Sequence, residues 1–123
     1  MNIRHVQQSI RYAWRGVRHV YRHEQNFRIQ VSIGVLVIAL MFVFGLNRLE
    51  KVVILLLVIS VLSLELLNSA LEKFIDVMKP RLHSQVEVVK DIMAAVVLCT
   101  SAGALLIGVL LFWPHVVEFI ERL

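Results

Sequence analysis

The feature of this sequence that most constrains its fold is a polar helix face inside a segment long enough to cross a membrane. The stretch from Val52 to Leu71 is apolar almost throughout, and about 20 such residues suffice for a spanning helix. At about 100° per residue, four polar side chains fall within roughly 80° of one helix face: Glu65, Asn68, Glu72 and Asp76. Carboxylates within a span are costly and by default mark a functional site. This face therefore predicts a site.

Two further apolar stretches accompany this one. Hydrophobic residues make up 59% of the 123 residues, above the roughly 45–50% of ordinary globular domains. The excess predicts three membrane-spanning helices, at about residues 28–46, 52–71 and 92–113. Residues 1–22 are charged throughout, unlike a secretory signal, and the single Cys99 excludes an intrachain disulfide. The sequence predicts one all-α integral membrane domain covering residues 1–123.

The positions of the positive charges predict the orientation of the spans. Six arginines lie before or at the start of the first span and four cations lie between the second and third, whereas three lie on the other side: Arg48, Lys51 and Arg122. This asymmetry fits the positive-inside rule, with the N-terminus and second loop cytoplasmic. The net charge of +4 is thereby explained by topology, and no nucleic-acid partner is expected.

Residues 1–24 are predicted to form an amphipathic surface helix. Five arginines gather within roughly 60° of one face, opposite a broad apolar face: Arg4, Arg11, Arg15, Arg18 and Arg22. Such a helix lies in the membrane interface, with its arginines at anionic headgroups and Trp14 and Tyr21 at the boundary. Two roles stay open: a membrane anchor only, or an anchor that also covers a site formed by the spans.

The segments that join these helices carry their own signals. Glu24 and Arg28 stand at i and i+4, a spacing that allows a helical ion pair. Residues 47–51 are expected to form a short turn between the first two spans. Pro80 is expected to end the second helix, followed by a cytoplasmic loop over residues 79–85. The last residues, 113–123, are expected to form a short interfacial segment.

Acidic and cationic groups from three segments converge on the cytoplasmic boundary. Carboxylates with a lysine suit a hard cation such as Mg²⁺ carried by a nucleotide, and Lys90 could contact phosphate oxygens. The desolvated Glu65 could act as general base toward a membrane-borne hydroxyl. This combination describes phosphoryl transfer to a lipid alcohol.

Two alternatives remain open from the residues alone. The sequence has no GxxxxGK[ST] loop and no kinase glycine-rich loop, so no soluble nucleotide-binding motif supports a kinase. A small oligomeric transporter could use the polar face as an ion or proton pathway, and a structural subunit could use it to hold helices together. The second span is apolar from Val52 through Ile59, which favours a one-sided site over a pore.

Three sequence blocks, in this order and between three spans, carry a family resemblance: EQNFR at 24–28, ELLNSALEKFID at 65–76 and KDIMAAVVL at 90–98. The chain resembles the small bacterial membrane lipid kinases, the prokaryotic diacylglycerol kinase and undecaprenol kinase family, from about Tyr12 to Leu111. The resemblance implies a homotrimer in the bacterial cytoplasmic (inner) membrane, with active sites at subunit interfaces. It also implies ATP and Mg²⁺ as cofactors and undecaprenol or diacylglycerol as substrate.

The resemblance also assigns roles to residues. Glu65 corresponds to the catalytic base, and Glu24 and Glu72 to the pair that holds nucleotide-bound Mg²⁺. Further positions correspond to residues that contact or lie near ATP: Tyr12, Arg81, Leu82, His83, Lys90 and Asp91. The positions that match the lipid pocket are Asn26, Phe27, Arg28, Gln30 and Ala94, together with Glu65 itself. Asn68 and Asp76 match supporting polar residues of the same site.

Several positions depart from the family pattern. Ala13 and Ala94 stand where enterobacterial diacylglycerol kinases have serines, and His5 stands where they have an arginine near the nucleotide. The NFR after Glu24 and the proline at position 80 are more similar to the undecaprenol kinase branch. These features favour undecaprenol over diacylglycerol as the substrate.

Overall fold

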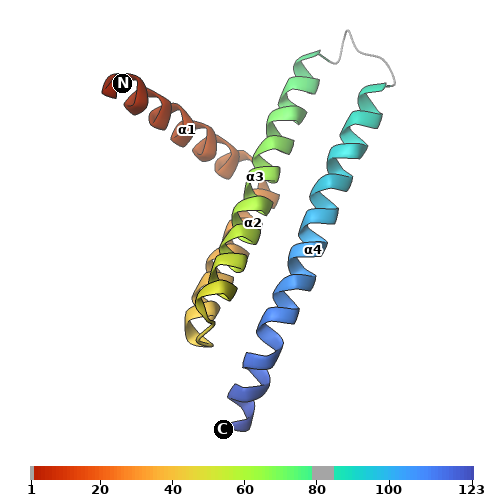
Figure 1. The fold of residues 1–123 in the computed structure, drawn as a ribbon. Helices are drawn as coiled ribbons and strands as arrows, with labels where there is room; N and C mark the ends of the chain where they lie inside the picture. Colours follow the sequence, from red (N-terminus) through yellow and green to blue (C-terminus); the bar gives the residue numbers. More distant parts are fainter. Residues whose placement is uncertain (1, 79–84) are drawn as a thin grey trace.

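The chain folds into four helices, described by a computed structural model for residues 2–78 and 85–123. In chain order they are α1 Ile3–His23, α2 Gln25–Val43, α3 Arg48–Met78 and α4 Gln85–Glu121. Figure 1 shows α2, α3 and α4 running side by side, while α1 leaves the bundle at a steep angle. α3 packs against both α2 and α4. The described residues contain no strand.

Three of these helices are long and apolar enough to cross a membrane, namely α2, α3 and α4. They correspond to the three apolar stretches that the sequence indicated, except that α2 ends at Val43 and not at residue 46, so the expected all-helical architecture with three candidate spans is confirmed. α3 ends at Met78, ahead of Pro80. The expected loop over residues 79–85 lies outside the described residues, except that Gln85 already begins α4.

The turn between α2 and α3 lies earlier than expected, at residues 44–47 rather than 47–51. Gly45 adopts a left-handed φ of 66°, which favours glycine because it has no Cβ. The backbone N–H of Gly45 donates to Phe42 at 3.2 Å, and that of Leu46 donates to Met41 at 3.1 Å. This pair of bonds is a Schellman motif, and it ends α2.

The first turn of α3 is closed by a capping box. Asn47 Oδ1 accepts from the backbone N–H of Glu50 at 2.9 Å, and Glu50 Oε2 accepts from the N–H of Asn47 at 2.9 Å. The sequence NRLE was interpreted as a turn, but only Asn47 precedes the helix. His115 of α4 reaches the same Glu50 oxygen through Nε2 at 2.9 Å, so this contact joins α4 to the start of α3.

Close packing of α2 on α3 occurs on either side of this turn. Met41, Leu46 and Ile54 form a buried apolar cluster. Farther along, a Cβ added to Gly34 would lie 3.1 Å from Cγ1 of Val58, so the absence of a side chain lets the two helices approach closely. The hairpin is therefore fixed both at its turn and at mid-length.

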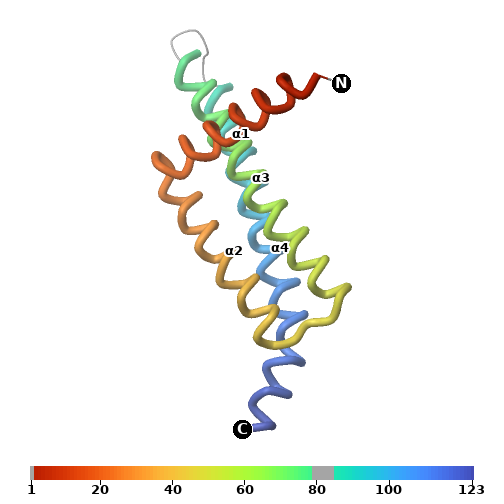
Figure 2. Tube along the Cα trace, turned by 90° about the vertical axis from the view of Figure 1, so that its left-hand side faces the viewer, coloured from red at the N-terminus to blue at the C-terminus, as the bar shows by residue number. Residues whose placement is uncertain are grey.

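α4 is longer than the third span predicted from sequence. Pro114 lies inside the helix, and residues 114–121 continue it where a separate segment was expected. A proline within a helix removes one backbone hydrogen bond, but the helix can continue past it. Figure 2 shows the C-terminal part of α4 extending beyond the α2–α3 turn.

The corner between α1 and α2 consists of a single residue, Glu24. Arg28, in the first turn of α2, donates from Nη1 to the carbonyls of Tyr21 and Arg22, both at 2.9 Å. These are carbonyls of the last turn of α1, which lack helical partners and favour a cation. Arg28 therefore forms no ion pair with Glu24, although their i, i+4 spacing allows one.

Candidate active site

A buried carboxylate lies at the centre of the predicted site. The side chain of Glu65 in α3 is only 3% exposed. Its Oε1 accepts hydrogen bonds from Asn26 Nδ2 and, at 3.1 Å, from Gln30 Nε2, and both donors lie on α2. Within the part of the chain that the structure describes, Oε2 receives no hydrogen bond. A buried carboxylate needs such partners to offset its lost hydration, and here one oxygen takes them both.

Glu65 lines a cavity of about 370 Å³ between α2, α3 and α4. Four other residues assigned to the site by resemblance or by the polar-face pattern line the same cavity, namely Asn26, Gln30, Asn68 and Ala94. The remaining lining residues are Val97, Leu98 and Ser101. Positions far apart in the sequence therefore meet here. The polar face of α3 lines a cavity whose opposite wall, from α4, is mostly apolar.

Two further carboxylates belong to this region. The charges of Glu24, at the α1–α2 corner, and of Glu72, two turns beyond Glu65, both act on the Glu65 carboxylate. Glu24 is half-buried and Glu72 is exposed, so these two are the more accessible acids. Three carboxylates from the corner and from α3 therefore share one end of the bundle.

These donors can be tested against the magnesium ion that the resemblance implies. Among residues 2–78 and 85–123, no group of three or more His, Cys, Asp or Glu side chains could hold a metal ion alone. Mg²⁺ prefers oxygen ligands and is commonly bound through one or two carboxylates together with substrate phosphates. Glu24 and Glu72 supply carboxylate oxygens only, so this donor set fits an ion that arrives with a nucleotide.

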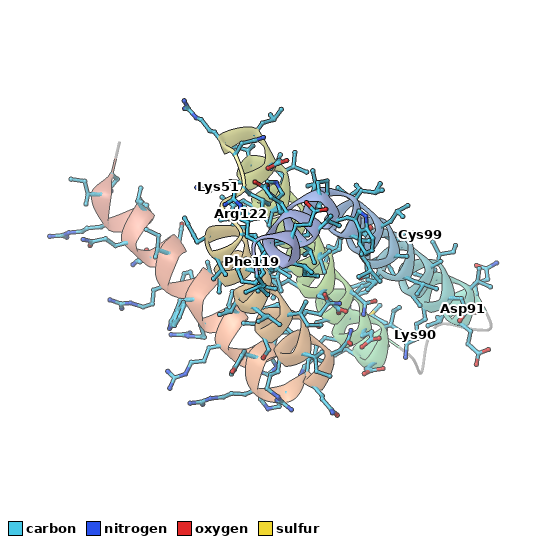
Figure 3. All side chains as sticks on the ribbon, turned by 90° about the horizontal axis from the view of Figure 1, so that it is seen from below. Lys51, Lys90, Asp91, Cys99, Phe119 and Arg122 are labelled. Carbon is cyan, nitrogen blue, oxygen red and sulfur yellow. The ribbon has the colours of Figure 1, made fainter. Side chains whose placement is uncertain are left out.

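The start of α4 places a cation beside the end of α3. Lys90 Nζ lies 3.6 Å from Asp76 Oδ1, with the two side chains 38% and 65% exposed. Asp91, the next residue, is exposed; Figure 3 shows Lys90 and Asp91 at the same end of α4. An exposed ion pair of this kind contributes little to stability, so the lysine is free to exchange its carboxylate partner for a phosphate.

Not every predicted residue joins the cavity. Tyr12 is exposed on α1, and its ring lies 5.7 Å from the Arg15 guanidinium carbon. Phe27 is buried, and Arg28 caps α1, so neither lines the Glu65 cavity. The positions Arg81, Leu82 and His83 lie outside the described residues.

The structure also reveals two polar features that the sequence analysis missed. Ser101 lines the cavity, and its Oγ is buried with no hydrogen-bond partner among the described residues. Lys73 donates from Nζ to His19 Nε2 at 3.2 Å and so joins α3 to α1. Neither feature has a sequence signature, because each depends on how helices distant in sequence pack against one another.

Sequence comparisons place these features in a known group. The family described as prokaryotic diacylglycerol kinase matches residues 11–112. A diacylglycerol kinase of Synechocystis sp. is 36% identical over 107 residues, which is 86% of this chain and 61% of that protein. An undecaprenol kinase of Bacillus subtilis is 32% identical over 106 residues, 86% of each chain. A diacylglycerol kinase of Escherichia coli K12 is 27% identical over 104 residues, 85% of each chain.

The fold and the cavity define an all-helical membrane protein with a buried carboxylate site near one end of its bundle. The chain belongs to the prokaryotic diacylglycerol kinase family. The family and these named relatives are lipid kinases, so the resemblance seen in the three sequence blocks is confirmed. Membership favours an enzyme over the transport and structural alternatives.

Proposed function

We propose that this protein transfers the γ-phosphoryl group of ATP to the hydroxyl of a membrane lipid alcohol, with Mg²⁺, at the cytoplasmic face of the bacterial inner membrane. The observation that carries this proposal is the asymmetric Glu65 carboxylate. Asn26 and Gln30 hold one oxygen, while the other receives no hydrogen bond from the described residues. A positioned carboxylate with an unengaged oxygen is suited to take a proton from a bound hydroxyl.

The proposed reaction is a direct in-line transfer. Glu65 Oε2 takes the proton of the lipid hydroxyl as its oxygen bonds to the γ-phosphorus, the bond to the β-phosphate oxygen breaks, and ADP leaves. The lipid becomes a phosphate monoester. Most of the catalysis in such a transfer comes from positioning and charge neutralisation, and the amide donors on Glu65 supply the positioning of the base.

Cations and carboxylates at the same end of the bundle are proposed to hold the nucleotide. When bound, Mg²⁺ would neutralise charge on the phosphates, and Glu24 and Glu72 are its proposed ligands. Lys90 is the proposed phosphate contact, with Asp91, Tyr12 and positions 81–83 nearby. Asn68 and Asp76 support the site, and Phe27, Arg28 and Ala94 are assigned to the lipid side of it.

The proposed assembly is a homotrimer with a cytoplasmic N-terminus. α1 is proposed to lie in the membrane interface as an amphipathic helix, because its arginines gather on one face and none of its residues is buried in this chain. The lysine and arginine asymmetry of the loops supports the orientation. Of the two lipid alcohols, undecaprenol is favoured by NFR at 26–28 and by Pro80.

The test is ATP consumption by purified protein in mixed micelles, with undecaprenol and diacylglycerol offered separately and then in competition. We expect turnover that depends on both Mg²⁺ and lipid, with undecaprenol preferred. At least tenfold faster turnover of diacylglycerol would overturn the substrate preference. The kinase assignment itself fails if folded, oligomeric protein consumes ATP with neither lipid.

A further inference from the structure

The Glu65 cavity continues into a second, apolar cavity. This second cavity has a volume of about 540 Å³ and lies between the same three helices. Both cavities are lined by Asn26, Gln30 and Ser101, so the polar end of the second cavity adjoins the Glu65 cavity. Beyond those three residues the lining of the second cavity is apolar, and we call it the apolar groove.

The apolar groove runs along the bundle away from the carboxylates. On α4 it is lined from Ser101 to Phe112, which at 1.5 Å per residue is a length of roughly 16 Å. The hydrocarbon core of a bilayer is about 30 Å thick. The groove therefore has about the depth of one leaflet, with its polar mouth at the end that carries Glu65.

We infer that the apolar groove holds the hydrocarbon chain of the lipid alcohol, and that Gly108 controls the space available to it. The inference rests on the proposed function, because a lipid whose hydroxyl lies at Glu65 needs a path by which its hydrocarbon chain leaves the first cavity. The groove is the apolar exit that shares walls with that cavity. Ser101 Oγ, buried and unpartnered among the described residues, stands where the two cavities meet and is available to an oxygen near the lipid headgroup.

Gly108 is suited to control the groove because it lines it and leaves room beside it. A Cβ added at Gly108 would meet nothing within 4 Å, so a larger side chain would enter the groove rather than clash with the fold. Gly108 lies seven residues beyond Ser101 on α4, roughly 10 Å deeper. Only a chain that extends this far past the headgroup reaches it.

The experiment compares Gly108→Leu with wild type on two series of lipid alcohols of increasing chain length, diacylglycerols from dibutyryl to dioleoyl and polyprenols up to undecaprenol, and uses the series that wild type turns over faster. The matched control is Gly103→Leu, because a Cβ at Gly103 also meets nothing within 4 Å and this residue does not line the groove. We expect Gly108→Leu to raise the ratio of long-chain to short-chain KM at least fivefold. Gly103→Leu should leave that ratio within twofold of wild type.

Three outcomes overturn the inference, and they are distinguishable. An unchanged KM ratio in Gly108→Leu means that the chain lies elsewhere. A changed oligomeric mass in Gly108→Leu, measured by light scattering and accompanied by equal losses on all lipids, means that a second copy of the chain covers the groove. If wild type consumes ATP with no lipid alcohol of either series, undecaprenol included, the proposed function fails first and the inference falls with it.

Discussion

The substitution Glu65→Gln separates the chemistry of the site from its packing. Glutamine has the shape of glutamate and keeps one carbonyl oxygen, which can still accept from both Asn26 and Gln30. Its amide nitrogen replaces Oε2, the oxygen without a hydrogen bond among the described residues. The variant therefore preserves the cavity walls and removes only the proton acceptor.

The expected effect on rate is large, and the expected effect on stability is small. A general base contributes about 10²–10⁴-fold, which corresponds to roughly 2.7–5.5 kcal/mol of barrier. On the stability side, hydrogen bonds to a charged acceptor are each stronger than neutral ones by about 1 kcal/mol. Removing a buried charge has the opposite sign, so the two contributions to the free energy of unfolding largely cancel.

The assay is lipid-dependent ATP consumption in micelles, normalised to protein that elutes at the wild-type size and unfolds at the wild-type temperature. Glu121→Gln provides the control, because it makes the same chemical change at an exposed residue at the end of α4. We expect Glu65→Gln to lose at least 100-fold in kcat and the control to lose none. Turnover of Glu65→Gln within threefold of wild type, in folded protein, would refute the role of Glu65 as base.

Three further perturbations address other contacts. Glu72→Ala should raise the Mg²⁺ concentration for half-maximal activity at least tenfold; an unchanged requirement would remove this residue from the metal site. His115→Ala should lower the midpoint of a denaturant titration, because the Glu50 carboxylate loses the partner that joins α4 to the start of α3; an unchanged midpoint would mean that water replaces it. Burial, together with the charges of His23 and Lys73, lowers the pKa of His19 below its usual value. His19 therefore takes up a proton more readily when α1 is detached from α3, and as the pH falls below about 6.5 protonation favours the detached state. A spectroscopic distance between α1 and α3 should therefore lengthen at low pH, and shortening would contradict this sign.

The fold could be predicted because its main signal is local. Apolar runs of membrane-spanning length and polar residues on one face of α3 are read directly from residue spacing. Gly45 and Asn47 show the limit of this prediction. Both residue types favour a turn, but Gly45 ends α2 whereas Asn47 caps the start of α3. That difference depends on backbone hydrogen bonds that composition does not reveal. The same holds for Pro114, which lies within α4 although its chemistry favours a helix end.

The resemblance named several residues that the structure brings to one cavity, but it did not predict their contacts. Motif positions named Asn26 and Gln30 together with Glu65, and the structure brings these three together. That both amides reach the same oxygen depends on side-chain geometry between α2 and α3. Arg28 illustrates the opposite case, because its motif position suggested the lipid pocket, while the sharp α1–α2 corner brings unpaired carbonyls within its reach.

The sharpness of the α1–α2 corner has a mechanical consequence. Only one residue separates the two helices, and the Arg28 guanidinium joins their ends, so the angle of α1 is coupled to the first turn of α2. Asn26 lies in that first turn, and Gln30 lies one turn farther. A change in the tilt of α1 would therefore act first on Asn26, so one of the two hydrogen bonds that hold Glu65 depends on the angle of a helix outside the bundle.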